Sequence, residues 1–311
     1  MLGFLWLVWW LDRYDREPVG LYLLTFVWGA VGSITVAMLG SCIVELPILI
    51  LAPGLADTAG AVLVAPLVEE PSKACFLLLL MFSRHFDNMT DGFVYGAAIG
   101  LGFGMTENFM YFADVGATGD AVGWVMTVVI RTLYSAVMHA TATSIVGASL
   151  GWAKFRGPAA IVLFGTAGIC IAIAVHAFWN GMLTLDAAAN ANGALLGINL
   201  LIFPFEVGFT ALVFQVCLLQ ESAVIRRELR EEAEQGRIPP EHPAIIASWW
   251  RRGQSWWVPR GLEHDSYVQT MTTLAMRKEQ FRLTGDDFYK DDVAVLREQV
   301  DKMWDKARAA A

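Results

Sequence analysis

Ionisable side chains that could perform acid–base chemistry stand inside the apolar stretches of this sequence. The first group is Glu69, Glu70 and Lys73, in the segment Pro66-Leu-Val-Glu-Glu-Pro-Ser-Lys. On a helix, the Lys73 ammonium reaches Glu70 at i,i+3 and Glu69 at i,i+4. Two adjacent carboxylates are costly to ionise together at low dielectric constant, so we expect one to be neutral or to be held charged by Lys73. Such a pair can serve acid–base catalysis, or it can be a structural ion pair that joins helices.

A second and a third group follow on later apolar stretches. Tyr111 falls one turn after Glu107, so both can face the same side of a helix. Arg131, Ser135 and His139 are spaced four residues apart and form one polar stripe. A charged group at the centre of a bilayer costs at least about 2.5–3.5 kcal/mol. Each of these side chains therefore requires a partner, a wet cavity or a function.

A fourth group, His176 and Asn180, places an imidazole and an amide one turn apart. At 1.5 Å of rise per residue, the two glutamates of the first group lie roughly 15 Å below the outer ends of their helices, and His176 lies roughly 12 Å below. Glu107 is shallower and His139 is deeper. Four helices therefore direct polar groups to a common layer, which predicts a single site.

Peptide hydrolysis is a reaction that these residue types suit. It needs a base that activates water, donors for the oxyanion and an acid for the leaving amine. Glu69 or Glu70 can act as the base and then as the acid. His176 and Asn180 offer two donors from one helix face, suited to the oxyanion.

A zinc site is the other interpretation of the same residues. Glu107, His139 and His176 supply the carboxylate and imidazole ligands that Zn²⁺ takes in catalytic sites with an open water position. The glutamate mechanism requires no cofactor, and the sequence leaves both mechanisms open. The predicted catalytic set is Glu69, Glu70, Lys73, Glu107, His139, His176 and Asn180.

The elements that must position these residues are transmembrane helices. The chain of 311 residues is 56% hydrophobic and 17% charged, with a mean hydropathy of +0.50, whereas a soluble domain carries about 25% charged residues. Six stretches have the roughly 20 apolar residues that a helix needs to cross the hydrocarbon core. They are residues 19–51, 59–82, 92–112, 121–150, 159–183 and 194–219. Leu2–Leu11 is too short to span unaided, so we predict an all-α transmembrane helix bundle of six to seven spans.

The connections between these stretches predict the orientation. The basic connections are residues 12–18, 83–90 and 151–158 and the tail that begins near Arg226. The intervening connections, near 57, 114–120 and 186–192, contain neither Lys nor Arg. The positive-inside rule places the basic connections and the C-terminal tail in the cytoplasm. Gly96, Gly100 and Gly104 form a smooth stripe along which another helix can approach closely.

Residues 221–311 differ in composition from the first 220. They hold 15 of the 22 basic and 16 of the 30 acidic residues. Apolar residues at helical spacing predict an amphipathic final helix: Val293, Leu296, Val300, Met303 and Ala307. The segment from Trp249 to Trp257 interleaves indoles with cations, which suits either contact with membrane lipids at the interface or packing within a small helical domain. We predict a transmembrane protease core at 1–220 and a cytoplasmic amphipathic helical tail at 221–311, with no basic patch for nucleic acid.

The motifs together resemble those of the PrsW family of intramembrane proteases. The resemblance rests on Glu69-Glu70-x-x-Lys73, Phe103-x-x-x-Glu107-Asn108-x-x-Tyr111, His139 and His176-x-x-Trp179-Asn180, in this order, and on the entry segment Asp12–Pro18. It covers about residues 12–220. It implies a multi-pass protease of the bacterial plasma membrane that performs site-1 cleavage of single-span, membrane-anchored proteins such as anti-sigma factors. That family is described both as glutamic and as metalloprotease.

The motifs are also similar, more distantly, to those of CAAX prenyl endopeptidases. In that group a Glu–Glu motif, an FxxxH motif and an HxxxN motif supply a glutamate-activated water. Glu107 stands here where the FxxxH motif has its histidine, which leaves open whether His139 takes the orienting role. A proton- or solute-coupled transporter is the alternative function, since buried Glu, His and Lys also build relays. The sequence has no internal repeat that would favour it.

Overall fold

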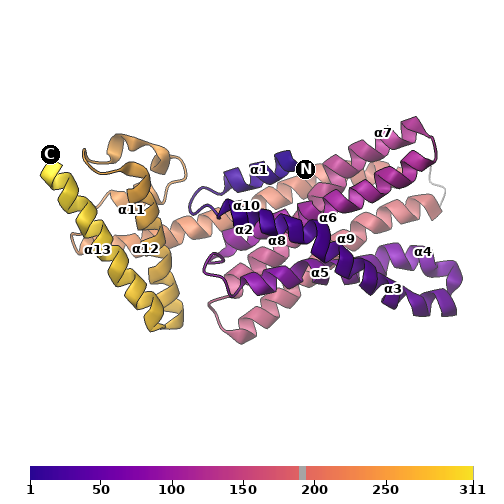
Figure 1. Cartoon of the computed structure of the whole chain (residues 1–311), viewed down its shortest axis with the longest axis horizontal. Coiled ribbons are helices and arrows are strands. Elements are labelled where there is room, and N and C mark those ends of the chain that lie inside the picture. The colour runs from indigo at the N-terminus through magenta and orange to yellow at the C-terminus, as the bar shows by residue number, and fades with distance from the viewer. Residues whose placement is uncertain (189–193, 311) are drawn as a thin grey trace. The chain divides into compact units, whose positions relative to one another are not determined.

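The computed structural model describes residues 1–188 and 194–310, in which the elements are helices (Figure 1). Part of the predicted connection 186–192 lies outside the described residues. The chain divides into two compact units. The first consists of Met1–Leu11, Glu17–Lys154 and Pro158–Phe214, and the second of Asp12–Arg16, Phe155–Gly157 and Gln215–Ala311.

The first unit is a bundle of helices. They are α1 (Leu2–Leu11), α2 (Val19–Val27), α3 (Ile34–Leu51), α4 (Ala56–Ala59), α5 (Ala65–Leu80), α6 (Met89–Ala117), α7 (Ala121–Ile130), α8 (Ala136–Ala153), α9 (Pro158–Ala188) and part of α10 (Ala194–Glu234). A 3₁₀ turn, Pro53–Leu55, precedes α4. Three π-helical turns, Trp28–Ser33, Gly60–Val64 and Arg131–Ser135, join α2 to α3, α4 to α5 and α7 to α8.

Among the residues that the structure describes, four helices are long and apolar enough to cross a membrane, so the chain is a multi-pass membrane protein. They are Val19–Leu51, Ala121–Ala153, Pro158–Asp186 and Ala194–Glu234. The predicted stretches 59–82 and 92–112 fall on α4–α5 and on α6, the helices that carry Glu69, Glu70, Lys73 and Glu107. α1 is a separate short apolar helix.

Each π-helical turn has a backbone carbonyl that accepts a hydrogen bond from a side chain of another helix. Thr106 donates to Ala30 O at 2.7 Å, Asn108 to Arg131 O at 2.8 Å and Asn180 to Ala61 O at 2.9 Å. A π-helical turn interrupts the regular i→i−4 pattern, and an interrupted backbone inside a membrane needs replacement partners. These bonds therefore fix the turns next to the functional side chains.

Glycines allow α6 to approach α8 closely, as the stripe predicted. A Cβ added at Gly96 would lie 2.4 Å from Thr143 O, and one at Gly100 would lie 2.2 Å from His139 O. At these positions only the glycine hydrogen atoms fit between the two backbones, and any larger side chain would clash. The contact sets the position of His139 relative to α6.

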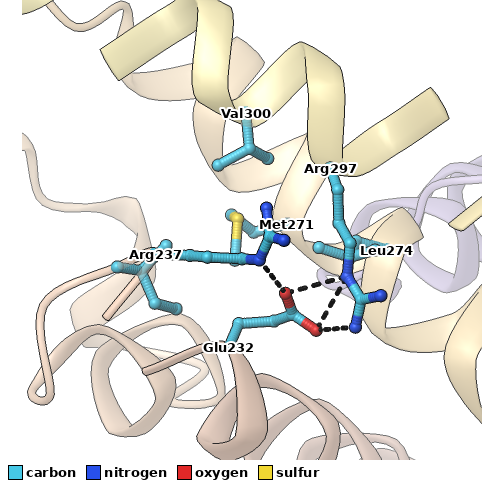
Figure 2. A pocket seen from close by; sticks show the side chains of 7 residues that line it. Glu232, Arg237, Met271, Leu274, Arg297 and Val300 are labelled. Carbon is cyan, nitrogen blue, oxygen red and sulfur yellow. Dashed lines mark hydrogen bonds and ion pairs between the residues drawn. The ribbon is translucent and has the colours of Figure 1, made fainter. Parts of the chain in front are cut away.

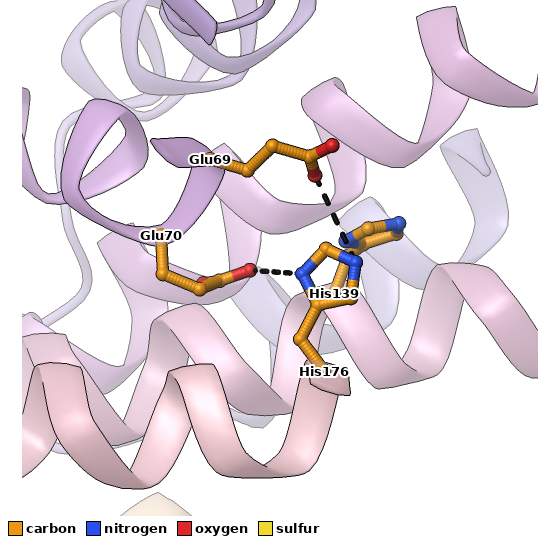
Figure 3. A group of neighbouring side chains, drawn as sticks. All are labelled: Glu69, Glu70, His139 and His176. Carbon is orange, nitrogen blue, oxygen red and sulfur yellow. Dashed lines mark hydrogen bonds and ion pairs between the residues drawn. The ribbon is translucent and has the colours of Figure 1, made fainter. Parts of the chain in front are cut away.

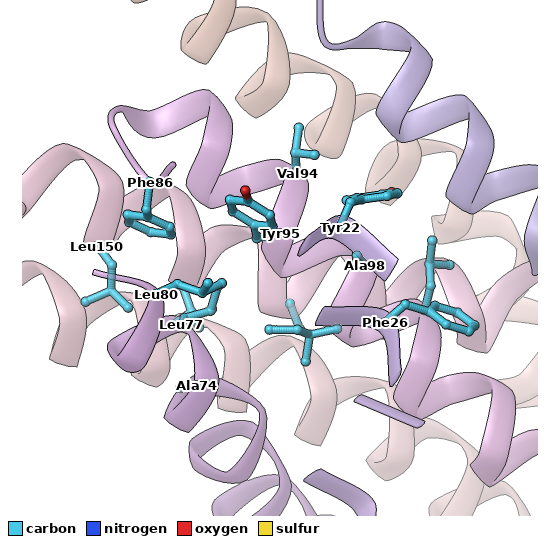
Figure 4. Close-up of a cluster of buried hydrophobic side chains, with 14 of the residues drawn as sticks. Tyr22, Phe26, Ala74, Leu77, Leu80, Phe86, Val94, Tyr95, Ala98 and Leu150 are labelled. Carbon is cyan, nitrogen blue, oxygen red and sulfur yellow. The ribbon is translucent and has the colours of Figure 1, made fainter. Parts of the chain in front are cut away.

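A buried apolar cluster fills the same unit beside these helices (Figure 4). Leu77 of α5 and Tyr95 of α6 are fully buried in it, together with Tyr22 and Phe26 of α2. Tyr95 also donates a hydrogen bond to the buried Glu17 carboxylate. The cluster holds α2, α5 and α6 together.

The second unit contains the rest of α10 with α11 (His242–Ile246), α12 (His264–Thr284) and α13 (Asp287–Ala310). Val293, Val300 and Ala307 are buried along α13, at three of the five positions of the predicted apolar stripe. Figure 2 shows a pocket of this unit in which Glu232 lies between Arg237 and Arg297. The nearest Arg297 nitrogen is 2.6 Å from the Glu232 carboxylate, so the charges that line the pocket already pair with each other.

The segment of tryptophans and arginines has both buried and exposed members. Arg252 is buried and donates to Tyr14 O at 2.8 Å and to Thr272 Oγ1 at 3.0 Å. Trp257 is also buried, whereas Trp250 and Trp256 are 71% and 68% exposed. Two 3₁₀ turns, Arg251–Gly253 and Ser255–Trp257, shape the segment. The buried residues pack the segment against the unit and leave two indoles at the surface.

Candidate active site

Glu69, Glu70 and Lys73 lie on α5, and the lysine contacts both carboxylates. Lys73 Nζ is 2.7 Å from Glu70 Oε1 and 3.6 Å from Glu69 Oε2. The ammonium also lies 3.9 Å from the ring centroid of Phe103 on α6, a cation–π contact. The side chains of Lys73 and Glu70 have no exposed surface, whereas that of Glu69 is 14% exposed. Glu69 is therefore the carboxylate of the pair that can meet a substrate or water.

His139 on α8 is fully buried and uses both ring nitrogens. Nδ1 is 3.0 Å from Lys73 Nζ, and Nε2 is 2.6 Å from Glu107 Oε2. An ammonium can only donate, so Nδ1 accepts from Lys73 and the ring proton on Nε2 is donated to Glu107. The imidazole thus joins the lysine of α5 to the glutamate of α6.

Glu107 contacts two side chains, Arg131 and His139. Its Oε1 is 2.6 Å from Arg131 Nη2, and its Oε2 accepts from His139. Asn108 fixes the arginine further, because its Oδ1 accepts from Arg131 Nε at 3.1 Å. The guanidinium lies 3.5 Å from the ring centroid of Tyr111. Glu107 is therefore placed to orient the imidazole of His139 and to neutralise Arg131.

His176 on α9 reaches the glutamates from the opposite helix. Its Nδ1 is 2.8 Å from Glu70 Oε1, and its Nε2 is 3.8 Å from Glu69 Oε2. A carboxylate can only accept, so Nδ1 carries the proton and donates it to Glu70. The lone pair of Nε2 then faces Glu69.

The two imidazoles share one arrangement. Each ring donates one N–H to a glutamate. The other ring nitrogen, Nδ1 of His139 and Nε2 of His176, keeps a lone pair and is called the inner nitrogen below. The inner nitrogen faces Lys73 in His139 and Glu69 in His176. The rings meet edge to face with centroids 4.9 Å apart. One potential ligand atom from each of Glu69, Glu70, His139 and His176 lies within 4.8 Å of the others (Figure 3). Carboxylate–histidine pairs of this kind orient metal ligands in known metal sites.

The structure brings together six of the seven predicted site residues and leaves Asn180 outside their contacts. The Asn180 amide nitrogen donates to the carbonyl of Ala61 in the π-helical turn before α5. This bond ties α9 to the helix of the glutamates, and the role of Asn180 as an oxyanion donor stays a prediction. His176 lies with the glutamates, where one of its ring nitrogens bonds Glu70.

Two residues with defined contacts were given no role from the sequence. Phe103 supplies the ring beneath Lys73, and Asn108 fixes Arg131. Both lie in the segment that contains Glu107, four residues and one residue away from it. That spacing was the sequence feature that could have assigned them to the site. Residues 147–151 match the form G-x-S-x-G, but Ser149 lies inside α8 and donates to Ile145 O. A nucleophilic serine of that motif stands on a strand-to-helix turn, so this match is coincidental.

Comparison with known proteins decides the family. A family model described as PrsW family intramembrane metalloprotease matches residues 17–216, more than half of the chain. The chain belongs to the PrsW family. The helices with the glutamates, histidines and Arg131 all lie in the matched range. PrsW membership therefore covers the whole candidate site.

The chain is similar to curated PrsW proteases of three bacteria. It is 28% identical to Protease PrsW of Bacillus subtilis over 174 residues, which is 56% of this chain and 74% of the relative. It is 31% identical to Protease PrsW of Geobacillus kaustophilus over 147 residues (46% and 59%). For Protease PrsW of Clostridioides difficile the identity is 32% over 102 residues (32% and 42%). No solved structure matches the chain.

The donor set fits the metal that the PrsW family description implies. Two carboxylates and two imidazoles are ligands that Zn²⁺ accepts. Oε2 of Glu69 and Oε2 of Glu70 are buried and have no hydrogen-bond partner among the described residues. His139 Nδ1, His176 Nε2 and Glu69 Oε2 are the atoms that would hold the ion, with Glu107 and Glu70 orienting the imidazoles. Lys73 is the feature that opposes this fit, because its ammonium contacts the same groups.

Proposed function

We propose that this chain is an intramembrane endopeptidase in which Glu69 activates the attacking water. The observation that carries the proposal is the group of Glu69, Glu70, His139 and His176, whose ligand atoms converge within 4.8 Å inside the helical bundle. PrsW membership supports peptide-bond hydrolysis as the reaction. Glu69 is chosen over Glu70 because it is partly exposed, whereas Lys73 and His176 both bind Glu70.

The proposed reaction begins with a water molecule between Glu69 and His176. The Glu69 carboxylate takes one proton from the water, while the inner nitrogen of His176 accepts the other hydrogen as a hydrogen bond and fixes its direction. The water oxygen bonds to the scissile carbonyl carbon, and the carbonyl π electrons move to the oxygen. When this oxyanion collapses, the C–N bond breaks and protonated Glu69 returns its proton to the leaving amine.

The other charged groups set up this step. Lys73 neutralises Glu70 and is the cation next to Glu69, 3.6 Å away, where negative charge moves during the reaction. Glu70 holds the proton of His176 on Nδ1, which keeps its inner nitrogen an acceptor. Glu107 does the same for His139. A Zn²⁺ ion held by the inner atoms would polarise the scissile carbonyl as a Lewis acid.

The membrane topology that we propose has six spans, with α4–α5 and α6 crossing beside the four long apolar helices. Buried charges lower the hydropathy of these two helices, but the site they build accounts for those charges. Positive-inside counting supports a cytoplasmic C-terminal unit. The proposed location is the bacterial plasma membrane, because the curated relatives come from bacteria. The proposed substrates are single-span membrane proteins, with anti-sigma factors as the first class to examine.

The exposed indoles support a further proposed partner, the membrane lipids. Tyr14 O accepts from Arg252 in the segment that exposes Trp250 and Trp256. Indoles beside cations suit the headgroup layer. We expect shallow brominated lipids in nanodiscs to quench less emission in a variant with both exposed indoles changed to Phe, and equal quenching would refute the contact.

The test of the function is cleavage of a single-span reporter by the full chain reconstituted in nanodiscs. We expect cleavage by the wild type and by Glu45→Gln, a glutamate of α3 outside the site, and loss of cleavage in Glu69→Gln. Cleavage that survives both Glu69→Gln and Glu70→Gln would refute the glutamate mechanism. Absence of cleavage together with proton flux in liposomes would replace the proposal with transport.

A further inference from the structure

The ammonium of Lys73 lies among the groups that would bind a metal ion. Its Nζ is 2.7 Å from Glu70 Oε1, 3.0 Å from His139 Nδ1 and 3.6 Å from Glu69 Oε2. Three of the four residues that converge in Figure 3 therefore contact one fully buried cation. The ring of Phe103 covers a further side of it.

One nitrogen lone pair cannot accept a hydrogen bond from an ammonium and coordinate a metal ion at the same time. His139 directs one lone pair inward, on Nδ1, because Nε2 gives its proton to Glu107. That lone pair already accepts a hydrogen bond from Lys73. A divalent ion could bind Nδ1 only if the ammonium left that nitrogen. Two cations so close together in a buried site would also repel each other strongly.

We propose that Lys73 and a divalent metal ion occupy the site alternately, so that the lysine is a built-in competitor of the metal. With Lys73 in place, the site contains a cation that balances Glu70 and leaves Glu69 free to act as the base. With Lys73 withdrawn, His139 Nδ1, His176 Nε2 and Glu69 become available as ligands. The inference rests on the active site assigned above, but it concerns binding and not cleavage.

The experiment measures metal affinity in the full chain in detergent, with no substrate present. Zn²⁺ is titrated against a fluorescent chelator for the wild type and for Lys73→Met, which keeps a linear side chain of similar length without the charge. We expect Lys73→Met to bind Zn²⁺ at least about tenfold more tightly, since no hydrogen bond to a charged group has to be broken. Lys73→Arg, which keeps the charge, is expected to bind no more tightly than the wild type.

Two further variants show whether the added affinity belongs to this site. His139→Ala and His176→Ala, each combined with Lys73→Met, are expected to remove the gain. Co²⁺ bound to Lys73→Met is expected to give the intense visible absorption of a four-coordinate site. If Lys73→Met does not fold, Lys73→Gln takes its place in the same titration.

Equal Zn²⁺ affinity in the wild type and in the uncharged variants would overturn the inference. A gain that persists without His139 would overturn it as well. Both results are independent of the proposed function: a wild-type enzyme that cleaves its reporter while these affinities stay equal refutes the competition and leaves the protease intact. If Lys73→Met binds Zn²⁺ more tightly but the wild type cleaves no reporter, the competition stands and the proposed function is refuted.

Discussion

Glu107→Gln separates the orientation of His139 from the chemistry of Glu69. Glu107 accepts from His139 and from Arg131 at 2.6 Å each, and the side chains of Glu107 and Arg131 are 16% and 12% exposed. A glutamine keeps a single acceptor oxygen and no charge, so one of the two partners loses its bond. A hydrogen bond to a charged group contributes about 1.5–3 kcal/mol, and partial exposure of the pair puts the loss toward the lower end.

The expected result is a fall in kcat/KM of about 10–100-fold, the range observed when a group that orients a site histidine is removed. That range corresponds to about 1.4–2.8 kcal/mol, in agreement with one lost charge-assisted bond. The loss is expected in kcat, because Glu107 binds His139 and Arg131 and not the activated water. The assay is reporter cleavage in nanodiscs at several substrate concentrations.

Glu107→Asp is the matched control for this prediction. It keeps the charge that pairs with Arg131, so we expect it to recover part of the lost activity. The reasoning is refuted if Glu107→Gln stays within twofold of the wild type. It is also refuted if Glu107→Gln is as inactive as Glu69→Gln, since an orienting group would then be as necessary as the base.

Three further predictions follow from the packing and the hydrogen bonds. Gly100→Ala places a Cβ 2.2 Å from His139 O, so reporter cleavage and the thermal midpoint are expected to fall, whereas Gly20→Ala, with nothing within 4 Å, is expected to match the wild type. Asn180→Ala removes the tie to the π-helical turn before α5 and is expected to cost about 1 kcal/mol of stability with cleavage still measurable; complete inactivity in a folded variant would instead support the catalytic role predicted from the sequence. Burial lowers the pKa of His242 in the second unit to about 4, so the stability of that unit is expected to fall as the pH drops from 6.5 through 4, because the unfolded state takes up the proton first. Limited proteolysis of the full chain tests this, and His242→Phe is expected to flatten the pH dependence.

The partners of the buried charges could be predicted from the sequence only where they lie on the same helix. Lys73 follows Glu69 and Glu70 at i+4 and i+3, and both contacts are present. Arg131 is 24 positions from Glu107, so no spacing along one helix points to Glu107 as its partner. The contact of α6 with α8 at the glycine stripe, together with Asn108, decides in favour of Glu107.

The roles of the histidines and of Asn180 could not be predicted, for a physical reason. Which nitrogen of His176 carries the proton depends on which atom Glu70 approaches, and no spacing along the chain encodes that. Asn180 faces a carbonyl that is available because α4–α5 contains a π-helical turn. An irregular turn of this kind inside an apolar run leaves no pattern in hydrophobic periodicity.

The most direct test of the central claim compares single-turnover cleavage by Glu69→Gln and Glu45→Gln in the same nanodisc preparation, with the products identified by mass. If Glu69 is the base, its variant is expected to cleave about 10²–10⁴-fold more slowly than the wild type, at the same peptide bond, while Glu45→Gln keeps the wild-type rate. A Glu69→Gln enzyme that cleaves within tenfold of the wild type would contradict the assignment.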